Sequence, residues 1–200
     1  PAASEAAYLG MLDSLGMSRG VLVQISVYGT DNRCMVESLK RHSGRLRGVA
    51  VVSPDVDESE LADLHAAGVR GVRINVLYGG GVGLDIMERL AAKIAPLGWH
   101  IQLLLDARQL PEIGPVIAKL PTEVVIDHMG HMPVSCGVTH PGFQWMQRLL
   151  KDGRAWVKLS GAYRISGAGA PFHDTLAFAH ALLDAAPDRC VWGSDWPHVA

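Results

Sequence analysis

Side chains that can exchange a proton follow two short apolar runs of this chain. They are Asp195 and His198 after the run at 190–192, and Asp127, His128 and His131 after the run at 123–126. A carboxylate at the end of a buried strand must be hydrogen-bonded, paired or catalytic, because burying it alone is too costly. Asp195 could instead cap a turn before the following proline. Because two strands in one chain end in the same combination of an acid and an imidazole, we expect these residues to form a functional site.

The elements that must position these residues alternate regularly along the chain. Apolar runs predict strands at 20–27, 46–52, 69–76, 99–105, 123–126 and 155–159, and one from residue 190. Helical spacing of apolar residues predicts helices at 4–15, 33–42, 58–67, 84–97, 110–120, 142–151 and 174–186. Three consecutive glycines at 79–81 predict a loop and lack the lysine of a phosphate-binding loop. Such alternation is typical of parallel βαβ units, here in one domain spanning 1–200.

The fold class is therefore α/β, and seven strand–helix repeats behind one leading helix favour a (β/α)8 TIM barrel over an open sheet. On this interpretation a first strand precedes residue 1 and a last helix follows residue 200, in keeping with the usual barrel length of about 250 residues. The active site of such barrels lies at the carboxyl ends of the strands. Polar residues gather there: Tyr28, Arg73, Asn75, His100, Gln102, Asp127, His128, His131, Lys158, Tyr163, Arg164, Asp195 and His198.

Several of these residues have a structural interpretation beside the functional one. Arg73 either pairs with a structural carboxylate or binds a substrate anion through its planar guanidinium. His100 stands at the start of its strand and so could lie low in the barrel. Gln102, two residues later with the same facing, is the better candidate for a pocket.

Alternation along the strand at 123–126 separates the next two side chains. Asp127 should point towards the helices and make structural hydrogen bonds, whereas His128 should face the barrel interior. Lys158 is either ion-paired or a desolvated amine suited to Schiff-base chemistry.

Composition narrows the class of partner. The 200 residues are 48% hydrophobic, and a formal charge of −2 with both signs scattered argues against a nucleic acid. No apolar run is long enough to span a membrane, and no signal-peptide pattern opens the sequence. Three cysteines without metal-like spacing favour a reduced, cytoplasmic compartment.

Five segments together resemble one family, the amidohydrolase-2 family of TIM-barrel hydrolases, in its branch of pyrone-dicarboxylate and sugar lactonases. The segments are GVRIN at 71–75, WHIQ at 99–102, VIDHMG at 125–130, VKLSG at 157–161 and WGSDWPH at 192–198. The resemblance covers essentially the whole chain. The Asp-His-Met-Gly and Ser-Asp-Trp-Pro-His motifs are its most specific parts.

The resemblance implies roles for particular residues. Asp195 would act as the base towards water, and His128 would bind the substrate carbonyl or a metal. Arg73 and Arg164 would bind a substrate carboxylate. The remaining substrate-binding candidates are Gln102, His100, Tyr163, His131 and His198.

The resemblance leaves the cofactor open, because members with one divalent metal, zinc or manganese, and members without a metal are both expected. In a metal enzyme, His128 and Asp195 would be ligands. The family's His-x-His pair does not occur in residues 1–200, and His131 stands where the lactonase branch has an arginine. The expected partner is a small-molecule carboxylate or lactone, without nucleic acid or membrane, and a homo-oligomer is left open.

The expected reaction is attack of water on a lactone or related carbonyl. Asp195 accepts the proton of the water, while His128, together with the family's His-x-His pair or a metal that the pair would hold, stabilises the oxyanion that develops. Two alternatives remain from other classes. One is a Schiff-base lyase or decarboxylase using Lys158, and the other is a binding fragment without catalysis.

Overall fold

The computed structural model describes residues 3–77 and 84–198, so the glycines at 79–81 lie outside the described residues. The chain forms two compact units. Unit 1 comprises residues 1–73 and 195–200, and unit 2 comprises residues 74–194. The prediction of a single domain concerns how these units join and stays a prediction.

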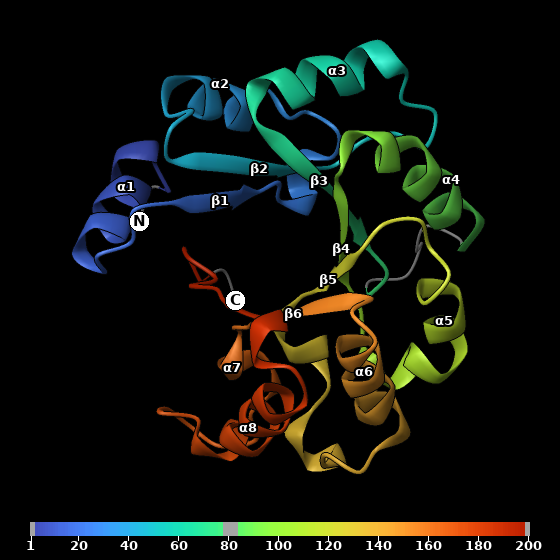
Figure 1. Ribbon diagram of the computed structural model, residues 1–200. Coiled ribbons are helices and arrows are strands. Elements are labelled where there is room, and N and C mark those ends of the chain that lie inside the picture. Colours follow the sequence, from blue (N-terminus) through green and yellow to red (C-terminus); the bar gives the residue numbers. More distant parts are fainter. Residues whose placement is uncertain (1–2, 78–83, 199–200) are drawn as a thin grey trace. The chain divides into compact units, whose positions relative to one another are not determined.

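Unit 1 alternates helices with parallel strands. Its elements are α1 (Glu5–Ser14), β1 (Gly20–Val23), α2 (Arg33–Arg41), β2 (Leu46–Ala50), α3 (Glu58–Ala67) and most of β3 (Val69–Asn75). β1 pairs with β2, and β2 with β3, both in parallel. Helices α2 and α3 lie together beside these strands (Figure 1). Leu39, Leu46 and Val72 are fully buried in the core.

Side-chain amides fix the loop after β1. Gln24 donates from Nε2 to the carbonyl of Asp31 at 2.6 Å, and Asn32 donates from Nδ2 to the carbonyl of Val51 at 2.8 Å. The predicted strand at 20–27 is therefore too long, because the chain turns into a short 3₁₀ segment, Ser26–Tyr28, after β1 has ended. β-branched residues favoured the longer strand, but the local hydrogen bonds to the turn prevail.

Unit 2 continues the alternation. Its elements are α4 (Leu84–Ile94), β4 (His100–Leu104), α5 (Leu110–Ile117), β5 (Val124–Ile126), α6 (Pro141–Lys151), β6 (Ala155–Leu159), α7 (Ala162–Ile165), α8 (Leu176–Ala185) and β7 (Cys190–Trp192). β4 to β7 pair in chain order, and every pair is parallel. The carboxyl ends of these four strands therefore share one edge of the sheet.

One face of this sheet is completely covered by helices. Ile101, Leu103, Val124, Ile126, Ala155 and Val157 alternate along β4, β5 and β6 and are all 0% exposed. Helices α5, α6 and α8 gather on this side (Figure 1), where the rings of Phe143 and Phe178 meet at 4.5 Å between centroids. The alternate residues of each strand must point to the opposite face.

The predicted helices and strands are all present in the described residues, with ends that differ by a few positions. Helix α3 has the predicted bounds, because Asp57 caps its first turn and Gly68 ends it with a φ of 107°. None of the described helices is long and apolar enough to cross a membrane.

Candidate active site

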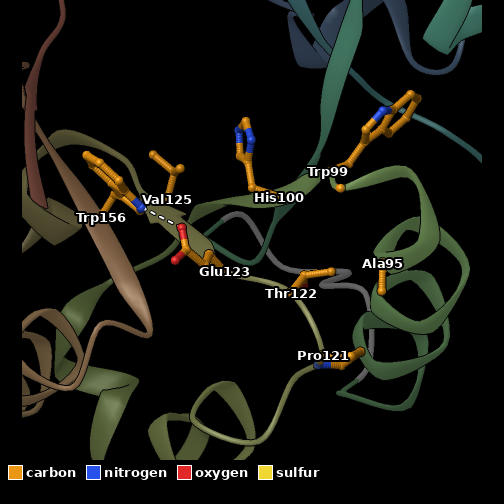
Figure 2. Close-up of a pocket in the computed structure, with 9 residues that line it drawn as sticks. Ala95, Trp99, His100, Pro121, Thr122, Glu123, Val125 and Trp156 are labelled. Atoms are coloured by element: carbon orange, nitrogen blue, oxygen red, sulfur yellow. Dashed lines mark hydrogen bonds between the residues drawn. The ribbon is translucent and has the colours of Figure 1, made fainter.

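The face of the unit 2 sheet opposite the helices carries two rows of side chains. His100, Val125 and Trp156 form the first row and line a hollow near the amino ends of their strands (Figure 2). Two residues further along the same strands stand Gln102, Asp127 and Lys158. Because side chains of a strand repeat their facing every second residue, the second row lies nearer the carboxyl ends on the same face.

The second row is a buried polar network. Gln102 donates from Nε2 to Asp127 Oδ2 at 2.9 Å, and Lys158 Nζ lies 2.9 Å from Asp127 Oδ1. The side chain of Asp127 is only 2% exposed and that of Lys158 is 19% exposed. A carboxylate at this depth requires such partners, since desolvation disfavours its charge.

The predicted facing of Asp127 is wrong. Alternation along β5 does place Val124 and Ile126 on one face, but that face is the one the helices cover. Asp127 therefore points away from the helices, to the side of Gln102 and Lys158. A hydrogen-bonding role for Asp127 is found as predicted, but on the opposite side of the sheet.

His128 reaches the same side through an unusual backbone turn. Its φ is 49°, and Met129 and Gly130 follow with φ values of 51° and 76°. These left-handed conformations interrupt the strand alternation directly after Asp127. The imidazole Nδ1 then lies 2.9 Å from the Ser160 hydroxyl, in a site where His128 is 9% and Ser160 is 7% exposed.

A second imidazole packs against the first. The rings of His128 and His131 meet edge to face, with 5.1 Å between their centroids. Asp106, which lies beyond the end of β4, contributes charge to this region. Burial raises the pKa of its carboxyl, but hydrogen bonds from Arg108 and the nearby charge of His131 outweigh that and leave the pKa below its usual value. Acidic and imidazole groups thus gather at the carboxyl ends of β4, β5 and β6.

His100 lies apart from this cluster. It is the first residue of β4 and lines the hollow with Val125, Glu123 and Trp156 (Figure 2), near the amino ends of the strands. This placement agrees with the structural interpretation of His100. A substrate contact for His100 stays a prediction, as it does for the buried Gln102.

Tyr163 and Arg164 lie on the short helix α7, which begins just after Ser160 and Gly161. The Arg164 guanidinium stacks over the Tyr163 ring at 4.9 Å from its centroid. Both side chains are half-buried. Stacking keeps the planar group oriented while its edge can still bind an anion.

The other predicted site residues belong to unit 1. Arg73 donates from Nη1 to the carbonyl of Gln24 at 3.1 Å, which ties β3 to the end of β1. Asp195 has a φ of 54° and accepts a backbone hydrogen bond from His198 at 2.9 Å. Asp195 and Arg73 belong to unit 1 and His128 to unit 2, so their role together in one site stays a prediction.

The sequence did not point to Ser160 as a partner of His128. Its contact with His128 joins positions 32 residues apart, so no local pattern reveals it. Its position in the sequence could have indicated it, because Ser160 directly follows β6, and β6 pairs with β5, the strand that leads to His128.

The described residues do not by themselves supply a metal site. In residues 3–77 and 84–198, no three His, Cys, Asp or Glu side chains are grouped as metal ligands. Protein zinc sites use three or four such ligands. A solved amidohydrolase from Burkholderia multivorans holds zinc, but at 21% identity and a TM-score of 0.72 the likeness concerns the fold alone.

A family model and several curated proteins match this chain, and they indicate the same family. A family model described as amidohydrolase matches residues 1–200. The chain is 38% identical to a 2-pyrone-4,6-dicarboxylate hydrolase of Comamonas testosteroni, over 98% of this chain and 68% of that protein. It is also 38% identical to a 4-sulfomuconolactone hydrolase of Rhizobium radiobacter, over 96% of this chain and 65% of the relative. The chain thus spans about two thirds of the length of these curated relatives.

A solved structure agrees with the sequence relatives. A Pseudomonas putida protein assigned as a 2-pyrone-4,6-dicarboxylic acid hydrolase is 38% identical, with a TM-score of 0.86 over 97% of this chain and 72% of its own. The predicted α/β fold of the TIM-barrel class and the predicted lactonase-like resemblance are both confirmed.

Proposed function

Because the chain belongs to the amidohydrolase family, we propose that it hydrolyses the cyclic ester of a small anionic molecule. The observation that carries this proposal is the 38% identity to two hydrolases whose named substrates are a pyrone dicarboxylate and a sulfonated muconolactone. Both substrates combine a ring ester with an anionic group. The same combination is the substrate class proposed for this chain.

The chemistry begins with water. In the proposed reaction Asp195 accepts a proton as the water oxygen attacks the lactone carbonyl. The carbonyl oxygen gains negative charge, and the imidazole of His128 stabilises it by donating a hydrogen bond. The bond between the carbonyl carbon and the ring oxygen then breaks, and the ring oxygen takes up the proton that Asp195 accepted. The open-chain carboxylic acid that forms releases its own proton to water and becomes a carboxylate.

The anionic substituent needs its own partners. Arg73 and Arg164 are the proposed ones, since a guanidinium binds a carboxylate or sulfonate with two parallel hydrogen bonds. Tyr163 orients Arg164 by stacking. His131 and His198 are proposed contacts to the remainder of the substrate.

The alternatives predict different products. A Schiff-base enzyme would use Lys158 as a nucleophile, but the ion pair with Asp127 engages that amine. Borohydride added with substrate would trap a covalent adduct on Lys158 in a Schiff-base enzyme and none in a hydrolase. A binding fragment would retain the lactone without opening its ring.

The proposed function is tested with the natural protein that carries this sequence, using 2-pyrone-4,6-dicarboxylate and 4-sulfomuconolactone as probes. The wild type should open the ring of at least one of them. Asp195→Asn should lower kcat by about 10²–10⁴-fold, because an amide cannot accept the proton, and should leave Kd nearly unchanged. Asp188→Asn, at an exposed acid seven positions earlier, is the control. Near wild-type kcat in Asp195→Asn would exclude Asp195 as the base.

A further inference from the structure

Two residues that follow β6, Ser160 and Gly161, lie against the His128 imidazole. Ser160 places its hydroxyl 2.9 Å from Nδ1. Ser160 itself lies close to Gly193, since a Cβ built at that glycine would lie 3.2 Å from the Ser160 Cβ and 3.4 Å from its Oγ.

Gly161 lies close to the same ring. A Cβ at this position would lie 2.8 Å from His128 Nδ1 and 2.9 Å from its Cβ and Cγ, closer than real Cβ contacts. Gly161 also has a φ of 65°, which places it in the left-handed region. The absence of a side chain thus lets the imidazole lie against the backbone that begins α7.

The direction of the hydrogen bond follows from the surroundings of the hydroxyl. In the part of the chain that the structure describes, His128 Nδ1 is the hydrogen-bond partner of Ser160 Oγ and no other is found. Ser160 is 7% exposed, so a hydroxyl proton aimed elsewhere would be buried without an acceptor. The hydroxyl is best satisfied by donating to Nδ1, which leaves the ring proton on Nε2.

We propose that Ser160 and Gly161 form a seat that fixes the orientation of the His128 imidazole and its Nε2–H tautomer. This inference rests on the proposed function, because the seat then presents Nε2–H as the donor to the developing oxyanion. Ser160 is a positioning residue here, since it acts through His128. A hydrogen bond to one ring nitrogen of a histidine determines whether the other ring nitrogen carries the proton. Here the contact at Nδ1 determines the state of Nε2.

The tautomer is measured independently of activity. In the natural protein with ¹⁵N-labelled histidine, the His128 signal is identified by its loss in His128→Gln. The wild type should show the Nε2–H form. Ser160→Ala should shift the nitrogen resonances towards a tautomer mixture, and Ser160→Thr, which keeps a hydroxyl, should retain the wild-type pattern.

The kinetic readout uses hydrolysis of 2-pyrone-4,6-dicarboxylate. Ser160→Ala should lower kcat by about 10–100-fold, the usual effect of losing a partner of a functional histidine, with a much smaller change in KM. Ser160→Thr should recover most of the loss. A general folding defect in Ser160→Ala would not give a loss confined to kcat that Ser160→Thr restores.

Gly161→Ala has a matched control. Gly98 has a φ of 66°, against 65° for Gly161, but a Cβ built there meets nothing within 4 Å. Gly98→Ala therefore carries the same backbone strain without touching an imidazole. Gly161→Ala should disturb the His128 resonances, and Gly98→Ala should leave them in place.

The outcomes separate the seat from the reaction. An unchanged His128 tautomer and an unchanged kcat in Ser160→Ala would contradict the proposal that Ser160 fixes the His128 imidazole. If the wild type opens no lactone, the proposed function fails, and the tautomer shift alone then decides for or against the seat. Equal disturbance of His128 by Gly161→Ala and Gly98→Ala would remove Gly161 from it.

Discussion

Strands β5 and β6 carry a polar cluster at each end, and the two clusters are built alike but buried differently. At the amino end, Glu123 pairs with Arg189 and accepts from the Trp156 indole at 2.7 Å (Figure 2). At the carboxyl end, Asp127 pairs with Lys158 and accepts from the Gln102 amide. Each cluster thus has one acid, one cation and one neutral donor.

Exposure separates the two clusters. The acid is 47% exposed at the amino end and 2% exposed at the carboxyl end. An exposed pair contributes little to stability because water solvates its separated charges almost as well. A buried pair contributes little net stability either, but removing one partner is costly. The carboxyl-end cluster is therefore strongly constrained, and it adjoins the seat of His128.

The largest predicted effect is on the buried cluster. Lys158→Met should lower the free energy of unfolding by about 3–5 kcal/mol, because it removes the cation from a carboxylate that is 2% exposed. Arg189→Met, the matched change at the amino end, should cost about 1 kcal/mol or less. Urea denaturation monitored by tryptophan fluorescence measures both. Equal losses would mean that burial does not distinguish the two ends.

A double variant sharpens the same contrast. Asp127→Asn combined with Lys158→Met removes both charges and keeps an oxygen for the Gln102 amide. It should recover about 1–3 kcal/mol relative to Lys158→Met alone, since the buried charge is gone. A double variant less stable than the single one would contradict the assignment of the loss to an uncompensated charge.

The third prediction concerns binding at the carboxyl end. Arg164→Met should weaken the binding of carboxylated ligands by about 1.5–3 kcal/mol, the range for a hydrogen bond to a charged group, and leave neutral ligands nearly unaffected. Calorimetry with matched acid and amide ligands measures the difference. Arg148→Met is the control, because Arg148 also stacks on an aromatic ring, that of Trp145 at 4.8 Å, but on helix α6. Equal losses for both ligand types would remove Arg164 from the site.

Local patterns were enough to predict the longer helices and the strands, but not the short helix α7. Apolar spacing placed the helices and strands because each element must bury one stripe or face. Termini were predictable where a side chain or glycine fixes them, as Asp57 and Gly68 do for α3. The end of β1 was not, because Gln24 turns the chain through contacts with residues beyond it.

The polar strand ends were predictable from the sequence, but the geometry of the cluster was not. The motif around His128 was recognisable, but alternation gave the wrong side of the sheet for Asp127, since both strand faces are apolar where β5 begins. The left-handed turn that starts at His128 cannot be read from residue types, because a histidine rarely has a φ of 49°. The contact with Ser160 depends on the pairing of β5 with β6.

The smallest predicted effect is at the exposed end and depends on pH. Hydrogen bonds from Arg189 and from the Trp156 indole hold the pKa of the Glu123 carboxyl below its usual value. A carboxyl whose pKa is lowered by folding stabilises the protein above its unfolded pKa, about 4.3, and loses that contribution as the pH falls through the folded pKa. Glu123→Gln should therefore cost about 0.2–1 kcal/mol at pH 7.

The cost of Glu123→Gln should shrink as the pH falls below about 4, where the wild-type carboxyl also becomes neutral. It should also shrink in about 1 M salt, because mobile ions screen an exposed pair more than a buried one. Lys158→Met should keep most of its cost in the same salt, since its partner Asp127 is buried. Parallel denaturation series at low and high salt compare the two. A salt-independent cost for Glu123→Gln would show that its pair is as shielded from solvent as the buried one, and the contrast between the ends would fail.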